Sequence, residues 1–161
     1  MSGERRREGE TDPFAMLERC HRRVEERLAE LMRDWADARV VADVLDYFER
    51  SMTRHEADEE ESLFPRLRGV AELAGVLAAL EREHAEHARL HEELKGARGA
   101  QVAQVVARLQ AAYARHIARE ESELFPSARR LLDASAQHAM AAEMEARRPA
   151  RGQGGGEKRR P

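Results

Sequence analysis

The sequence predicts an all-α fold, an up-down-up-down antiparallel four-helix bundle with an additional C-terminal helix. The composition is rich in Ala, Leu, Arg and Glu, and only 4% of the residues are aromatic, so the residue types that strands prefer are scarce. Four segments of similar length carry apolar residues at steps of three and four, the spacing of an amphipathic helix. The connections between them are short, which favours antiparallel neighbours.

The first helix is expected to begin at Pro13, because Thr11 or Asp12 can cap its N-terminus and proline suits a first helical turn. It runs to about Trp35. Three further helices follow with the same apolar spacing, at about residues 38–64, 70–95 and 102–126. The second and the fourth are each expected to end at a Leu-Phe-Pro sequence, since proline cannot continue a regular helix.

The domain boundaries follow from these elements. The bundle is expected to span residues 12–126 and the additional helix, which is shorter and weaker in pattern, residues 127–148. Residues 1–11 are polar, and residues 149–161 are rich in Pro, Gly and charge. Both ends are therefore expected to be disordered tails.

The charge pattern limits the class of partner. The 28 basic and 31 acidic side chains are interspersed and the net charge is -3, so no basic field is present to recruit nucleic acid or anionic lipid. A single cysteine excludes an internal disulfide, the N-terminus lacks a signal-peptide pattern, and no apolar run approaches the roughly 18 residues that span a bilayer. We expect a soluble, cytoplasmic protein, of a bacterial source because Arg outnumbers Lys, whose partners are small molecules.

One short segment occurs twice. "HEADEEESLFP" at 55–65 and "HIAREESELFP" at 116–126 are identical at seven of eleven positions. Each copy places a glutamate one helical turn after a histidine, on the same face. Both histidines, His55 and His116, share a helix face with apolar residues, and so do His21 and His84 on the other two helices.

These side chains are expected to meet inside the bundle. With a rise of about 1.5 Å per residue, the short turns place the four histidines within a few Å of one depth. Glu59 and Glu120 complete the layer. Burying two carboxylates among imidazoles costs several kcal/mol unless a charge compensates, and a cation is the simplest compensation. A lone histidine on an apolar face is usually a core residue. Six histidine and glutamate side chains that face inward at the same depth, however, predict a metal site.

The residues quoted resemble the hemerythrin-like (HHE cation-binding) family, whose pattern is a histidine on the first helix, HxxxE on the second, a histidine on the third and HxxxE on the fourth. The likeness covers about residues 14–126. It implies two oxo- or hydroxo-bridged non-haem irons. The implied ligands are His21 and His55 on one iron, His84 and His116 on the other, and Glu59 and Glu120 bridging both. Mixed imidazole and carboxylate ligation suits Fe, and the ligand types also fit Zn or Mn.

Two alternatives concern the ligand set. A ferritin-like scheme would use Glu18-x-x-His21 and Glu81-x-x-His84, but it leaves the histidines of the repeated segment without a role. On the third helix, His87 is an alternative or an additional ligand. His91 lies roughly 10 Å along the helix from His84, too far to bind the same ion.

The fourth helix bears on oxygen carriage. Oxygen-carrying hemerythrins have a five-histidine site, with HxxxH on the third helix and HxxxxD on the fourth. This chain has HxxxE on the fourth helix instead. That departure disfavours reversible oxygen carriage. Tyr113, one turn before His116, is expected to pack in the core. Cys20 adjoins His21 on a different face of the helix and is expected to be a buried structural thiol.

Three functions remain open at this level. The first is a di-iron protein that binds, senses or scavenges O₂, NO or peroxide, or stores iron. The second is a redox enzyme with weak peroxide- or NO-reducing activity, or an iron-delivery protein for iron–sulfur centre repair, which needs a redox partner. The third is a plain interaction bundle with a basic contact tail at 157–161 and no stoichiometric metal. The sequence does not predict an oligomeric state.

Overall fold

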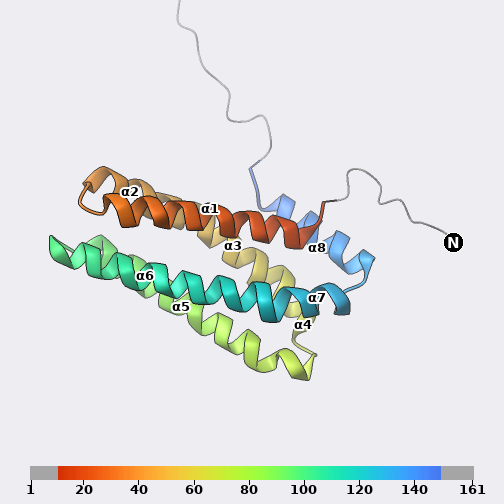
Figure 1. Cartoon of the computed structure of the whole chain (residues 1–161). Helices are drawn as coiled ribbons and strands as arrows, with labels where there is room; N and C mark the ends of the chain where they lie inside the picture. The colour runs from red at the N-terminus through yellow and green to blue at the C-terminus, as the bar shows by residue number, and fades with distance from the viewer. Residues whose placement is uncertain (1–10, 150–161) are drawn as a thin grey trace, which may run out of the picture.

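The computed structural model describes residues 11–149, and within that range every regular element is helical. Four long helical stretches lie side by side and a shorter helix packs at one end (Figure 1). The all-helical bundle predicted from the sequence is therefore confirmed. None of the described helices is both long and apolar enough to cross a membrane. The predicted tails and the basic contact segment lie outside the described residues, apart from Thr11 and Pro149.

The first stretch is α1 (Pro13–Asp34). Of the two expected capping residues, Asp12 is the one that acts, because its side chain accepts the backbone N–H of Phe14 at 2.9 Å. A short connection then leads to Asp37, which caps the next helix by accepting the N–H of Arg39 at 2.9 Å. The side-chain oxygen in each case satisfies a donor that the first helical turn leaves free.

The second stretch is continuous but not uniformly α-helical. Its segments are α2 (Ala38–Tyr47), η1 (Phe48–Met52), α3 (Thr53–Ala57), η2 (Asp58–Leu63) and α4 (Phe64–Leu67), and the two η segments are π-helical turns. The third stretch is the 3₁₀ turn η3 (Ala71–Leu73) with α5 (Ala74–Gly96). The fourth is α6 (Ala100–Arg119), the π-helical turn η4 (Glu120–Leu124) and α7 (Phe125–Leu131).

The expectation that Leu-Phe-Pro ends a helix is wrong in both copies. Before Pro65 the N–H of Phe64 reaches the carbonyl of Glu59, five residues back, and before Pro126 the N–H of Phe125 reaches the carbonyl of Glu120 in the same way. Each proline then begins a new α-helical turn, where its missing N–H has no consequence. The π-helical turns thus carry both helices past their prolines.

The additional C-terminal helix is shorter than expected. Residues 127–131 belong to α7, and α8 (Ala134–Ala146) begins only after Asp133, whose side chain accepts the N–H of Ala136 at 2.8 Å. The break falls at Leu132 and Asp133, which the sequence pattern predicts to lie inside one helix. Helix α8 packs against α1 and η2.

The core consists of two apolar clusters with a polar layer between them. One cluster, around Phe14, Leu80 and Met144, lies toward α8, and the other, around Leu28, Phe48 and Leu109, lies toward the α1–α2 and α5–α6 connections. Along each long stretch the sequence passes from one cluster to the other through buried histidines. The apolar clusters therefore isolate that layer from both ends of the bundle.

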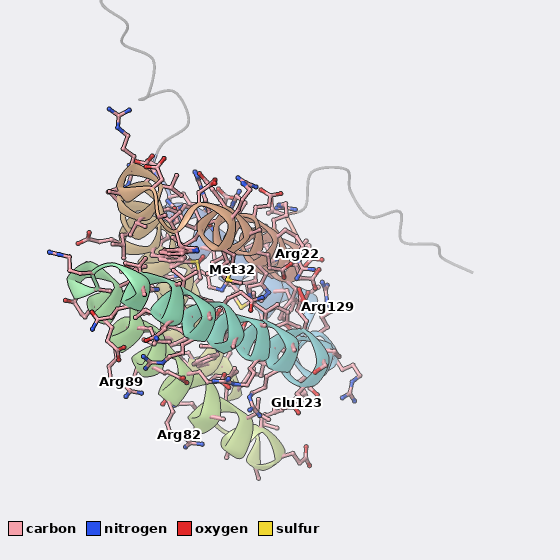
Figure 2. The ribbon with its side chains drawn as sticks, turned by 60° about the vertical axis from the view of Figure 1, so that its left-hand side comes forward. Arg22, Met32, Arg82, Arg89, Glu123 and Arg129 are labelled. Atoms are coloured by element: carbon pink, nitrogen blue, oxygen red, sulfur yellow. The ribbon has the colours of Figure 1, made fainter. Side chains whose placement is uncertain are left out.

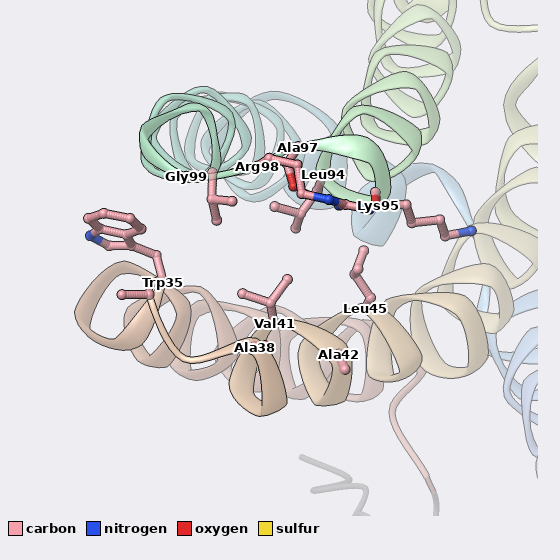
Figure 3. A pocket seen from close by; sticks show the side chains of 12 residues that line it. Trp35, Ala38, Val41, Ala42, Leu45, Leu94, Lys95, Ala97, Arg98 and Gly99 are labelled. Carbon is pink, nitrogen blue, oxygen red and sulfur yellow. The ribbon is translucent and has the colours of Figure 1, made fainter.

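Charged side chains surround this core, and those of Arg82, Arg89 and Glu123 point away from the helices (Figure 2). An apolar hollow of about 520 Å³ lies between the α1–α2 connection and the α5–α6 connection, at one end of the bundle (Figure 3). Trp35 and Leu94 are among its lining residues. No histidine lines it. The hollow is therefore separate from the buried polar layer.

A buried ion pair fixes α8 to the second stretch. The Asp58 side chain is fully buried, and its two carboxylate oxygens contact Arg147 and Arg148, each at 3.1 Å. Glu143 adds an exposed contact to Arg66 at 2.8 Å and accepts a partly buried hydrogen bond from the Ser62 hydroxyl at 2.7 Å. Because Asp58 immediately precedes Glu59, this attachment holds the beginning of the η2 turn.

We expect Asp58→Ala to lower the free energy of unfolding of the metal-free protein by roughly 3 kcal/mol, the lower end of the cost of breaking a buried pair, since the two arginines can still reach solvent. The control is Asp46→Ala, whose partner Arg50 is exposed, with an expected loss below about 1 kcal/mol. Urea denaturation in the presence of a chelator measures both. Equal losses in the two variants would contradict a stabilising role for the buried pair.

Candidate metal centre

The structure brings the six predicted side chains together in the polar layer. Each carboxylate lies against imidazoles of two different stretches. Around Glu59, the Nε2 atoms of His55 and His84 lie 2.6 and 3.1 Å from its oxygens. Around Glu120, the Nε2 atoms of His116 and His21 lie 2.6 and 3.0 Å away. Both carboxylates are fully buried, and the imidazoles are at most 5% exposed.

The same six residues form two adjoining groups. In one, the ligand atoms of His21 and His55 lie within 4.8 Å of one another and of both glutamates, and in the other His84 and His116 do so. Ring centroids are 5.0 Å apart in the first histidine pair and 4.9 Å in the second. The two groups therefore share both carboxylates, and each could hold a metal ion.

Several of these atoms have no hydrogen-bond partner. They are His21 Nε2, His55 Nε2, Glu59 Oε1 and both oxygens of Glu120. His55 Nε2 is nevertheless only 2.6 Å from Glu59 Oε1, so the two groups are close without the angles of a hydrogen bond. Buried polar atoms are rarely left unpaired, because each costs about 1–3 kcal/mol. Nitrogen and oxygen atoms that converge in this way fit a bound cation.

Electrostatics ties the metal-free cluster together. Burial on its own would lower the pKa of both His84 and His116, but Glu59 raises that of His84 to about 9, and Glu120 together with Glu83 raises that of His116 to about 10. Burial would likewise raise the pKa of Glu59, whereas the His55 imidazolium beside it holds that pKa well below its usual range. In the absence of a cation, the raised pKa values favour protonated imidazoles at His84 and His116, beside the buried carboxylates.

A second ring of acceptors orients three of the imidazoles. His84 Nδ1 lies 2.8 Å from Glu60, His116 Nδ1 lies 2.9 Å from Glu83, and His21 Nδ1 lies 3.4 Å from Glu121. Two of these carboxylates are in turn held by arginines: Glu83 by Arg119 at 3.0 Å and Glu121 by Arg22 at 2.8 Å. Acceptors behind Nδ1 turn Nε2 inward and make it a better ligand.

These contacts also give roles to the second glutamate of the pair and to the phenylalanine in each copy of the repeated segment. In the first copy, Glu60 accepts from His84 and Phe64 stacks on the same ring, with centroids 6.0 Å apart. In the second copy, Glu121 and Phe125 contact His21 in the same two ways, and the ring centroids are 5.7 Å apart. Each copy therefore supplies two candidate ligands and also positions a histidine of a neighbouring helix.

The sequence reasoning missed this outer ring, and it misjudged Cys20. The thiol is buried as expected, but it does not turn away from the site: its sulfur lies 3.3 Å from Arg23 Nη2 and interacts with the ring of His55. Burial on its own would raise the pKa of the Cys20 thiol, whereas His55 and Arg23 lower it to about 6. The sequence contained one signal for this role. Cys20 directly precedes the candidate ligand His21, just as Glu83, a member of the outer ring, directly precedes the candidate ligand His84.

The remaining histidines of α5 differ in their places. His87 is buried with its ring centroid 4.9 Å from that of His116, and its Nε2 has no hydrogen-bond partner, yet it belongs to neither of the two ligand groups. His91 Nε2 lies 3.1 Å from the hydroxyl of Tyr113, outside the cluster. Tyr113 is 1% exposed and stacks on His87 at 4.0 Å, so it packs in the core.

The ferritin-like ligand scheme does not fit this geometry. Glu18 lies 3.5 Å from Arg129 and Glu81 lies 2.8 Å from Arg68, and both glutamate side chains are at least 40% exposed. Neither carboxylate joins the buried layer. Those two Glu-x-x-His spacings are therefore incidental.

Because the imidazoles of His84 and His116 are protonated at neutral pH in the metal-free state, a divalent cation must displace their protons. We expect binding at pH 7.5 to release at least one proton from each, measured by calorimetry in buffers of different ionisation enthalpy. The stabilisation from their raised pKa values is complete below the ordinary value of 6.5 and is lost as the pH rises through about 9 and 10. Cation binding without proton release would contradict this electrostatic picture.

Comparison with known proteins agrees with the site. A family model described as hemerythrin HHE cation binding domain matches residues 12–128, which covers the four long stretches almost to the end of α7. No curated protein matches the chain. Because the match spans well over half of the sequence, the chain belongs to the hemerythrin HHE cation-binding family.

Proposed function

We propose that the protein is a non-haem di-iron protein that binds, senses or scavenges a small ligand such as O₂, NO or peroxide, or stores iron. One iron is held by His21 and His55, the other by His84 and His116, and Glu59 and Glu120 bridge them. The observation that carries the proposal is the converging set of buried nitrogen and oxygen atoms without hydrogen-bond partners. The bundle that holds them is proposed to be up-down-up-down over residues 12–126.

Iron suits this donor set, because imidazole and carboxylate together favour it over metals that prefer thiolate or oxygen alone. When bound, iron supplies redox chemistry and coordination positions that the protein leaves open to a small ligand. With two imidazoles and two shared carboxylates for each ion, neither coordination shell is filled by the six side chains. The two apolar clusters keep bulk water from the layer at both ends.

His87 is the side chain that distinguishes the two halves. Its free Nε2 lies on the His84 and His116 side, so we propose that it adds a fifth imidazole there or faces a ligand bound at that ion. The backbone of Ala112 is hydrogen-bonded to its ring, and burial lowers the pKa of His87 to about 3. His87 is therefore neutral and has a lone pair to offer.

The alternative is turnover: weak reduction of peroxide or NO, or delivery of iron to damaged iron–sulfur centres. The open coordination positions would serve this function equally well. Anaerobic reduction of the iron-loaded protein followed by air separates the two. A stable and reversible absorption change indicates ligand binding, whereas rapid autoxidation with consumption of added peroxide indicates turnover.

Metal analysis of purified variants tests the ligand set itself. We expect two irons per chain in the wild type and a large loss in His55→Ala and in Glu120→Ala, with a smaller stabilisation of each by iron in thermal melts, since metal binding is coupled to folding. His91→Ala is the matched control, because His91 lies on the same bundle outside the cluster, and it should keep two irons. Retention of two irons in both ligand variants would refute the assignment.

A further inference from the structure

The acceptors behind the imidazoles follow an approximate two-fold repeat. Glu60 of the second stretch supports His84 of the third, and Glu121 of the fourth supports His21 of the first. Glu83, which immediately precedes His84, supports His116. The repeat therefore calls for one more acceptor, which immediately precedes His21 and faces His55.

Cys20 occupies that place. The Nδ1 of His55 is buried and has no partner at full hydrogen-bond geometry, and the side chain of Cys20 interacts with the His55 ring. A sulfur acceptor is larger and weaker than oxygen, so its hydrogen bonds are longer than those that oxygen makes. In contrast, the corresponding Nδ1 of His116 has a carboxylate oxygen at 2.9 Å.

Two arginines keep the sulfur in position. Arg23 Nη2 lies 3.3 Å from it and Arg148 Nη2, just beyond α8, lies 4.0 Å from it. Arg119 holds Glu83 at 3.0 Å in the other half. Arg148 also contacts the buried Asp58, so the residues just after α8, which lie outside the family match, contribute to this half of the site.

We infer that Cys20 is the positioning residue for His55, whose Nδ1–H donates to the Cys20 sulfur so that Nε2 faces Glu59, as Glu83 positions His116. This inference rests on the proposed metal-binding function. It makes the two ions inequivalent, because a sulfur stands behind one imidazole and a carboxylate behind its counterpart. An acceptor of different strength changes the electron density that the imidazole offers to its ion.

The test uses Zn²⁺ as the probe, because it is diamagnetic and leaves the ring N–H signals visible by NMR. Cys20→Ala should weaken one of two zinc-binding steps by about 10–100-fold, the usual effect of losing an outer acceptor. The Nδ1–H signal of His55 should shift and exchange faster with water while that of His116 stays unchanged. Cys20→Asp, which returns an acceptor, should restore most of the affinity and slow the exchange.

Glu83→Ala is the matched variant of the other half. It should weaken the other zinc-binding step and alter the His116 signal while that of His55 remains. Thermal melts of the metal-free variants separate these effects from folding, and Cys20→Val, which has no acceptor, replaces Cys20→Ala in the test if the alanine variant does not fold.

Two results would overturn the inference in different ways. If the wild type binds two zinc ions and Cys20→Ala has the same isotherm and the same His55 signal, or merely loses stability without a change in that signal, the positioning role is wrong. If the wild type binds no zinc or iron, the proposed metal centre fails and the role of Cys20 fails with it.

Discussion

Two carboxylates buried completely among four imidazoles are the constraint on which the rest of the bundle depends. Glu59 and Glu120 are 0% exposed, and removing an ionised carboxylate from water without compensation costs several kcal/mol. In the metal-free protein, protonated imidazoles offset part of this cost. Several buried nitrogen and oxygen atoms nevertheless have no hydrogen-bond partner, so the compensation by protons is incomplete. The helices must hold these groups at one depth, and this is why the apolar core is divided into two clusters with the polar layer between them.

Each copy of the repeated segment contributes to that layer in several ways. Its histidine and the glutamate one helical turn later face the centre. The glutamate that follows directly and the phenylalanine fix a histidine of a neighbouring helix, and the π-helical turn carries the chain past the proline. π-helical turns are often found at functional sites because the inserted residue redirects side chains. Both carboxylates of the site lie in such turns, at Glu59 and Glu120. Helix α8 then braces one of the two turns through Asp58.

Periodicity and register were enough to find the helices and the six central side chains, because each lies on an apolar face and short turns fix relative depth. They were not enough for the outer ring. Glu60 is 46% exposed and resembles any solvated acid in the sequence, and only the neighbour across the helix interface gives it a partner. The continuation past Pro65 and Pro126 depends on a local change of helix type that the apolar spacing does not reveal. The break between α7 and α8 is likewise local, because the backbone becomes extended at Leu132 and Asp133 then caps α8.

The most direct test of the buried layer as a two-ion site is anomalous diffraction at the iron absorption edge, with crystals grown in the presence of Fe²⁺. We expect two peaks inside the bundle, one between His21 and His55 and one between His84 and His116, each adjoining both carboxylates. Peaks confined to surface acids, with none in the layer, would contradict the claim that these six side chains are arranged around a pair of cations.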